Sequence, residues 1–150
     1  MATITHNKIP TKRRIKHTAD LFGLHFPMRL EPTIYNITAD IAEEYNGGYW
    51  EFYTLSNGGF YMAPVSNAKF NVSCENGYEG LLSADALGVA ACLYAYSNLS
   101  FGVESAFTET CAEQYHWLRD FMLEHDEARG IHAGTCRGEG DLGGCGLTVF

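Results

Sequence analysis

Apolar residues first recur at helical spacing between Ile34 and Tyr45, in steps of three, four and four residues. This period predicts an amphipathic helix of about three turns. Pro32 suits the first turn of that helix, and Gly47-Gly48 ends it, because a glycine readily adopts the left-handed conformation found at helix C-termini.

From Tyr49 the period changes to two, in the aromatic and β-branched composition that strands prefer. Asn57-Gly58 predicts a tight hairpin with positive φ angles, so residues 60–63 form the returning strand. Two more alternating segments follow, at residues 69–74 and 78–82. We expect the four strands to form one antiparallel meander that is apolar on one face.

Two long helices are predicted after the strands. Residues 86–99 are apolar nearly all round, which is typical of a central buried helix, and Ser83 is a good N-cap for it. We expect this helix to pack on the sheet face formed by Trp50, Phe52, Phe70 and Val72. The second helix carries an apolar stripe of Phe107, Cys111, Tyr115, Leu118 and Met122. The fold class is therefore a single α+β domain, a four-stranded antiparallel sheet packed with about four to five helices.

The two ends of the chain differ from its middle. Residues 1–17 are rich in Lys, Arg and Thr without apolar periodicity, which predicts a flexible basic arm. Residues 134–150 are rich in glycine and predict an irregular tail. The globular domain spans residues 18–133 and opens on a short helix that Thr18 caps and Pro27 ends.

Charge is distributed unevenly along the 150 residues, whose net charge is −8. Residues 1–30 hold six cations against one acid, a net +5, and residues 31–150 hold four against seventeen, a net −13. An acidic body repels phosphate, so we expect weak or no DNA binding. The acidic residues either keep the protein soluble or form a surface that imitates DNA. Their scattered spacing favours the role in solubility.

The hydrophobic pattern of the sequence shows no targeting signal. No apolar run approaches the roughly 18 residues that span a bilayer, and the N-terminal segment lacks the apolar core of a secretory signal. We therefore expect a cytoplasmic protein without a membrane partner. The five cysteines contain no C-x-x-C pair, and we interpret Cys92 and Cys111 as small core residues.

Candidate chemistry is sparse, since no nucleophile, phosphate-loop or metal-site motif is present and no cofactor is implied. His132, Cys136 and Cys145 do not match the spacing of a zinc site. A carboxylate-dependent hydrolase remains an alternative, with acid–base groups drawn from Glu43, Glu44, Glu51, Tyr53 and His116. A DNA-associated regulator is another, with nucleic-acid contacts from Lys12, Arg13, Arg14 and Lys16.

The segment from Tyr45 to Pro64, YNGGYWEFYTLSNGGFYMAP, closely resembles the ArdB/KlcA antirestriction family of plasmids, prophages and genomic islands. The resemblance continues through LSADALG at residues 82–88 and YHWLR at residues 115–119, and covers roughly residues 20–130. It ends in the basic arm and in the glycine-rich tail.

This resemblance implies a small α+β domain that relieves type I restriction of incoming mobile DNA, without a known catalytic reaction. We expect a non-enzymatic protein, a monomer or weak dimer, that contacts a host defence or DNA-processing protein of unknown identity. The candidate partner-binding residues lie on the predicted hairpin and are Tyr53, Asn57, Gly58 and Tyr61.

Overall fold

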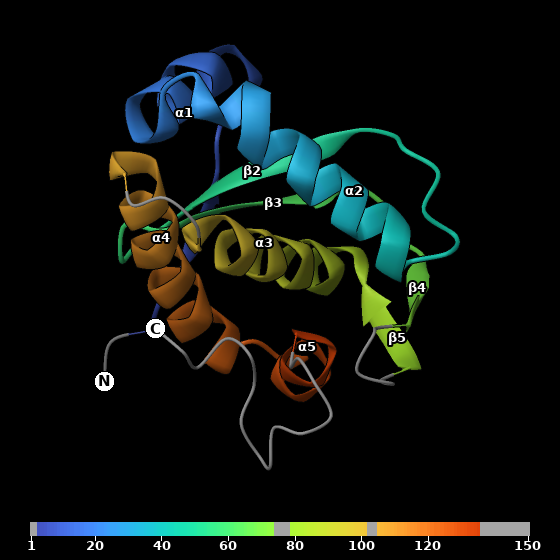
Figure 1. Cartoon of the computed structure of the whole chain (residues 1–150). Helices are drawn as coiled ribbons and strands as arrows, with labels where there is room; N and C mark the ends of the chain where they lie inside the picture. Colours follow the sequence, from blue (N-terminus) through green and yellow to red (C-terminus); the bar gives the residue numbers. More distant parts are fainter. Residues whose placement is uncertain (1–2, 74–78, 102–104, 136–150) are drawn as a thin grey trace.

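The structure is a computed structural model that describes residues 3–73, 79–101 and 105–135. It is an α+β fold in which helices pack around two antiparallel sheets (Figure 1). The strands are β1 (His6–Lys8), β2 (Trp50–Leu55), β3 (Phe60–Pro64), β4 (Lys69–Ser73) and β5 (Glu79–Ser83). The helices are α1 (Arg14–Phe22), α2 (Glu31–Ile41), α3 (Ala84–Ser100), α4 (Ala106–Leu123) and α5 (Ala128–Thr135). A 3-10 turn (Thr11–Arg13) precedes α1, and a π-helical turn (Phe26–Leu30) precedes α2.

The single four-stranded meander predicted from the sequence is wrong. The strands form a three-stranded sheet in the order β1-β2-β3 and a separate β4-β5 hairpin. The predicted β2–β3 hairpin is present, with Tyr53 opposite Tyr61. In the second hairpin Phe70 lies opposite Leu82, and both side chains are buried.

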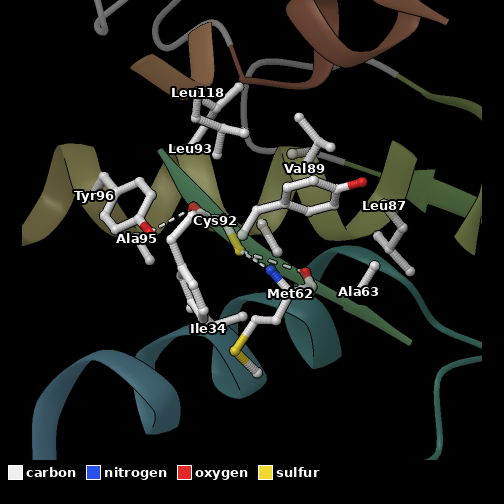
Figure 2. Packing of buried hydrophobic residues seen from close by; sticks show 14 of the residues in the cluster. Ile34, Met62, Ala63, Leu87, Val89, Cys92, Leu93, Ala95, Tyr96 and Leu118 are labelled. Atoms are coloured by element: carbon white, nitrogen blue, oxygen red, sulfur yellow. Dashed lines mark hydrogen bonds between the residues drawn. The ribbon is translucent and has the colours of Figure 1, made fainter. Parts of the chain in front are cut away.

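The free edge of β3 is covered by α3, which is why β4 does not pair with it. The Met62 amide donates to Cys92 Sγ and the Cys92 thiol donates back to the Met62 carbonyl, both at 3.5 Å (Figure 2). The Tyr96 hydroxyl donates to the Phe60 carbonyl at 2.8 Å. Helix α3 thus forms hydrogen bonds with backbone groups at the edge of β3 that would otherwise pair with a further strand.

The predicted position of α3 over Trp50 and Phe52 is also wrong, although the helix is buried as expected. The Trp50 ring packs against Tyr35 of α2 at 5.2 Å, and the Phe52 ring packs against Phe26 at 5.7 Å. The α2 helix and the π-helical turn therefore supply aromatic partners for this face, because α3 lies along the edge of β3.

Gly88 allows this close approach. A Cβ atom at Gly88 would lie 2.3 Å from Ala63 Cβ and 2.5 Å from both Ala63 Cα and the Met62 carbonyl oxygen. Two of these three atoms belong to the backbone of β3, which cannot rotate away as a side chain can. Gly88 is therefore required by packing rather than by its φ angle.

We predict that Gly88→Ala lowers the free energy of unfolding by about 1–3 kcal/mol, the usual cost of overpacking, although alanine is the better helix former. Urea denaturation measures the change. The matched control is Ala39→Gly on the exposed face of α2, where alanine should be the more stable residue by about 1 kcal/mol. A more stable Gly88→Ala protein would contradict the close packing of α3 on β3.

Within the segment predicted as a flexible arm, residues 6–8 and 11–17 form secondary structure. β1 pairs antiparallel with β2, the Ser56 amide donates to the Thr5 carbonyl at 2.9 Å, and the Ile9 amide donates to the Phe52 carbonyl at 2.7 Å. The three β1 residues are polar and exposed, so the strand leaves no apolar signal in the sequence, although His6 also stacks on Tyr53. Helix α1 begins at Arg14, ahead of the predicted start.

The first helix and the C-terminal region also differ from the structure predicted from the sequence. Gly23, with φ of 64°, follows the last residue of α1, and Pro27 lies in the first turn of the π-helical segment rather than ending a helix. Helix α5 was not predicted, because Gly130 lies within it. The predicted tail lies outside the described residues from position 136 onward.

The helix predicted through Tyr45 ends earlier, at Ile41, because Ala42 is extended, so Gly47-Gly48 do not end it; the two long helices after the strands are confirmed. Helix α2 buries Ile34 and Ile41, and the stripe of α4 is buried along its length, as are Cys92 and Cys111. Burial raises the pKa of both thiols to about 12, which keeps them protonated. Within the described part of the chain, we find no helix with the length and apolar character needed to cross a membrane.

Candidate functional site

The two tyrosines predicted on the hairpin meet on one face of the β1-β2-β3 sheet. The Tyr53 and Tyr61 rings stack with centroids 4.9 Å apart. His6 of β1 stacks on Tyr53 at 4.8 Å, and Phe121 of α4 packs on Tyr61 at 5.5 Å. We call these four residues the aromatic stack. Tyr61 is fully buried within it, so His6 and half-buried Tyr53 form its outer surface.

A chain of hydrogen bonds runs from the aromatic stack to Asp85, in the first turn of α3. The Tyr61 hydroxyl lies 2.6 Å from Asp85 Oδ1 and 2.6 Å from His6 Nδ1. An ionised carboxylate can only accept, so Tyr61 donates to Asp85 and its oxygen accepts from the His6 Nδ1–H group. The second oxygen, Asp85 Oδ2, lies 2.8 Å from His125 Nε2.

The hydrogen-bond chain continues into the turn between α4 and α5. The Glu127 amide donates to His125 Nδ1 at 2.9 Å, which leaves Nε2–H of the neutral ring as the donor to Asp85. The Glu127 carboxylate accepts from the Ser83 amide at 2.9 Å and from its hydroxyl. Ser83 also caps α3 as predicted, since its hydroxyl accepts from the Ala86 amide.

Ionisation of the Asp85 carboxyl is favoured by its two donors. Burial opposes the charged form, but the hydrogen bonds from His125 and Tyr61 outweigh it and lower the pKa of Asp85. The same contact with Asp85 raises the pKa of His125. Burial, followed by the Asp85 charge, raises the pKa of Tyr61, so this tyrosine stays a neutral donor.

We predict that Asp85→Asn lowers the free energy of unfolding by about 1–3 kcal/mol at pH 7, because one of two part-buried donors loses its acceptor. The native pKa of Asp85 is lowered, so its contribution is present above the unfolded value near 3.9 and is lost as the pH falls below that value. The stability difference from the unmodified protein should therefore shrink below about pH 4.

Urea midpoints measured from pH 7 to pH 3 test this prediction. The control is Asp20→Asn, which removes an exposed ion pair with Lys16 and should change stability by less than about 0.5 kcal/mol at every pH. An Asp85→Asn penalty that is the same at pH 7 and pH 3 would show that the network does not depend on the ionised carboxylate.

The tip of the hairpin packs against α4 instead of projecting freely. The Asn57 side-chain amide donates to the Trp117 carbonyl at 2.9 Å, and the Asn57 Oδ1 atom accepts from the Gly59 amide at 3.0 Å. Gly58 has φ of 101°, as the predicted turn requires, and a Cβ atom there would lie 3.5 Å from the Trp117 ring. The predicted tip residues therefore hold the hairpin on α4, with Gly58 exposed.

The predicted nucleic-acid residues divide into two groups. Lys12 and Arg13 are exposed, and Lys16 is exposed while it pairs with Asp20 on α1. Arg14 points inward: its Nη2 atom donates to Glu51 Oε1 at 3.0 Å, and its side chain is only 14% exposed. Arg14 is thus engaged inside the protein and unsuited to a phosphate contact.

The carboxylates of the hydrolase alternative are not gathered in one pocket. Glu43, Glu44 and Glu51 line three separate depressions. The Glu44 carboxylate accepts from the Asn71 amide, which lowers its pKa, and Glu51 is held by Arg14. His116 is exposed on α4. In residues 3–73, 79–101 and 105–135, no three metal-ligand side chains meet as a metal site would require.

Comparison with known proteins identifies the family. The family model of antirestriction proteins matches residues 43–134. The chain belongs to the antirestriction protein family. The antirestriction protein KlcA of Escherichia coli is 36% identical over 133 residues, covering 86% of this chain and 92% of the relative. A second E. coli KlcA is 39% identical over 107 residues, covering 70% and 73%.

A solved structure of this family has the same fold as this chain. It matches with a TM-score of 0.82 and 34% identity, over 89% of this chain and 99% of the other. The work on it describes the KlcA and ArdB proteins as having a novel fold and antirestriction activity against type I DNA restriction systems in vivo but not in vitro. The resemblance stated from the sequence is confirmed.

Four members of the hydrogen-bond chain were not predicted from the sequence: His6, Asp85, His125 and Glu127. Asp85 has a local role as an acid in the first turn of α3, which a sequence shows without revealing its partners. It lies in LSADALG, and His125 lies at the end of the segment that resembles the family, so the resemblance was a signal for both. His6 had no signal, because it lies in the arm outside the resemblance.

Proposed function

We propose that this protein relieves type I restriction of incoming DNA inside a bacterial cell. The observation that carries the proposal is its likeness, over nearly all of both chains, to a structure whose proteins have that activity in vivo. The family model spans residues 43–134, which include Tyr53, Tyr61 and Phe121 of the aromatic stack. Relatives named KlcA support the same assignment.

We further propose that it acts by contacting a protein without a catalytic reaction and without imitating DNA. A DNA mimic needs a row of free carboxylates, and several acids here are instead tied to neighbours. Glu51 pairs with Arg14, Asp85 accepts from Tyr61 and His125, and Glu127 accepts from Ser83. Their charges stabilise the fold, so they are poor substitutes for phosphates.

The exposed parts of the predicted partner-binding residues are the edge of Tyr53 and the turn at Gly58. We propose that Tyr53 contacts the partner, while Tyr61 supports it from below and Asn57 holds the turn on α4. Tyr53→Ala should then reduce activity in cells with little loss of stability, since its ring is half-buried. Unchanged activity in a folded Tyr53→Ala protein would remove this contact from the proposal.

The function is tested by transforming a strain that carries a type I restriction system with an unmodified plasmid. Cells that express the protein should yield more transformants, and a strain with an inactive restriction subunit should show no difference. The mechanism is tested with purified type I enzyme, where we expect little inhibition at equal molar amounts. Potent stoichiometric inhibition would instead support occupation of the DNA-binding groove of the enzyme.

A further inference from the structure

A groove of about 510 Å³ runs between α1 and the π-helical turn. Helix α1 lies at the opposite end of the molecule from α5 (Figure 1). Its lining includes the buried rings of Phe26 and Phe52 and the exposed side chains of Ile15, Leu24 and Pro27. It is separate from the aromatic stack, and none of the interactions described above closes it.

The rim of this groove carries strongly exposed apolar side chains. Ile15 is 84% exposed and Leu24 is 76% exposed, and both line the groove. Met28 follows in the π-helical turn and is 72% exposed. These are the highest exposed fractions among the large apolar residues that the structure describes. A solvent-exposed apolar cluster around a groove is typical of a protein-binding surface.

The groove lining also contains two charged residues, Arg14 and Glu31. The Arg14 guanidinium lies over the Phe52 ring at 4.5 Å, and the Arg14 Nε atom is buried without a hydrogen-bond acceptor. The acid in the lining, Glu31, already accepts from the Tyr35 hydroxyl at 2.9 Å. Both charged groups of the lining thus have partners inside the protein, Arg14 in Glu51 and Glu31 in Tyr35.

The groove also lies in the basic part of an acidic protein. Residues 1–30 carry a net +5, whereas residues 31–150 carry a net −13. Lys12, Arg13 and Lys16 are exposed next to the α1 residues that line the groove. An occupant that matches both features has apolar side chains for the groove and carboxylates for the basic border.

We propose that this groove binds an acidic amphipathic segment of the protein partner through which restriction is relieved. The inference rests on the proposed antirestriction function, and it names the chemistry of the partner's contact. DNA fits less well, because phosphates would engage Lys12 and Arg13 but leave Ile15, Leu24 and Met28 exposed to water. An apolar face on a helix, flanked by Asp and Glu, fills the groove and neutralises its border.

The first experiment compares two exposed apolar sites in cells. Ile15→Glu combined with Leu24→Glu places negative charge on the groove, and Leu81→Glu is the matched control, because Leu81 of β5 is 57% exposed outside the groove. Since all three side chains are exposed, thermal unfolding of the purified variants should match that of the unmodified protein. We expect the groove variant to lose about tenfold or more of its protection against type I restriction, and the control to retain it.

The outcomes separate the two proposals. If the unmodified protein gives no protection, the proposed function fails. If the unmodified protein and the groove variant protect equally, the function stands and the groove inference is overturned. An unfolded groove variant is replaced by Leu24→Glu alone, which changes one exposed side chain of the groove lining and to which the same expectation applies.

The second experiment tests the chemistry of the occupant with a synthetic helical peptide. The probe has leucines along one face and glutamates beside them, and its comparison peptide has lysines instead of the glutamates. We expect the acidic peptide to shift the amide NMR signals of α1 and the π-helical turn, with weaker binding at high salt and in the groove variant. Equal binding of both peptides, or no shift with the acidic one, would overturn the proposal.

Two other occupants give distinct results. Self-association of the protein that the groove variant abolishes, measured by sedimentation, would assign the groove to a second copy of this chain. Binding of a DNA duplex that Lys12→Glu and Arg13→Glu abolish, while the groove variant still protects cells, would assign the basic border to nucleic acid. Either result would overturn the proposed protein segment.

Discussion

Leu93→Asp should unfold the domain. Leu93 is completely buried at the middle of α3 and faces Leu118 of α4 (Figure 2). A carboxylate there has no partner. The free energy needed to bury an unpaired charge exceeds the typical free energy of unfolding of a domain, about 5–15 kcal/mol. We expect loss of the cooperative thermal transition, measured by circular dichroism.

Two comparison variants separate burial from other effects. Leu93→Ala keeps the site apolar and should cost about 2–5 kcal/mol while leaving a folded protein. Leu81→Asp introduces the same charge at an exposed position and should leave the melting temperature nearly unchanged. A Leu93→Asp protein that melts like the unmodified protein would contradict the position of α3 at the centre of the fold.

Elements with strong side-chain periodicity were predictable from the sequence. The apolar residues of α3, the stripe of α4 and the Asn57-Gly58 turn each carry a local signal, and each has its expected structure. Strand pairing was less predictable, because a period of two reveals a strand but not its neighbour. The edge of β3 could accept either β4 or a helix, and the contacts of Gly88, Cys92 and Tyr96 with β3 favour the helix.

The candidate site was predictable only in part for a similar reason. Tyr53 and Tyr61 flank a turn, so local geometry brings them together as a cross-strand pair. His6, Asp85 and His125 are far apart in the sequence, and they meet through the docking of β1, α3 and the turn after α4. Single polar residues at such separations leave no pattern that identifies them as partners.

The exposed groove could not be predicted from the sequence. Ile15 and Leu24 fall in segments without clear periodicity, and the basic run around Arg14 offers a nucleic-acid contact only in the alternative of a DNA-associated regulator. Arg14 instead turns inward to Glu51, which converts part of a charged arm into the wall of an apolar groove. The positive charge of this surface is predictable from the sequence. Its shape is not, because it depends on how α1 and the π-helical turn fold.

Protection of unmodified phage in living cells is the second large effect that we expect. A type I system reduces the plating of unmodified phage, and an antirestriction protein should restore it by orders of magnitude. The gain should be specific to restriction, so phage that carry the protective modification should plate equally with and without the protein. The folded Leu81→Glu variant should protect like the unmodified chain, and unfolded Leu93→Asp should not protect.

The efficiency of plating of unmodified phage, on restricting cells that express this chain, tests the central claim most directly. The account predicts a rise of orders of magnitude over cells that carry the empty vector, with no change for modified phage. An unchanged efficiency of plating, in cells shown to contain the folded protein, would contradict it.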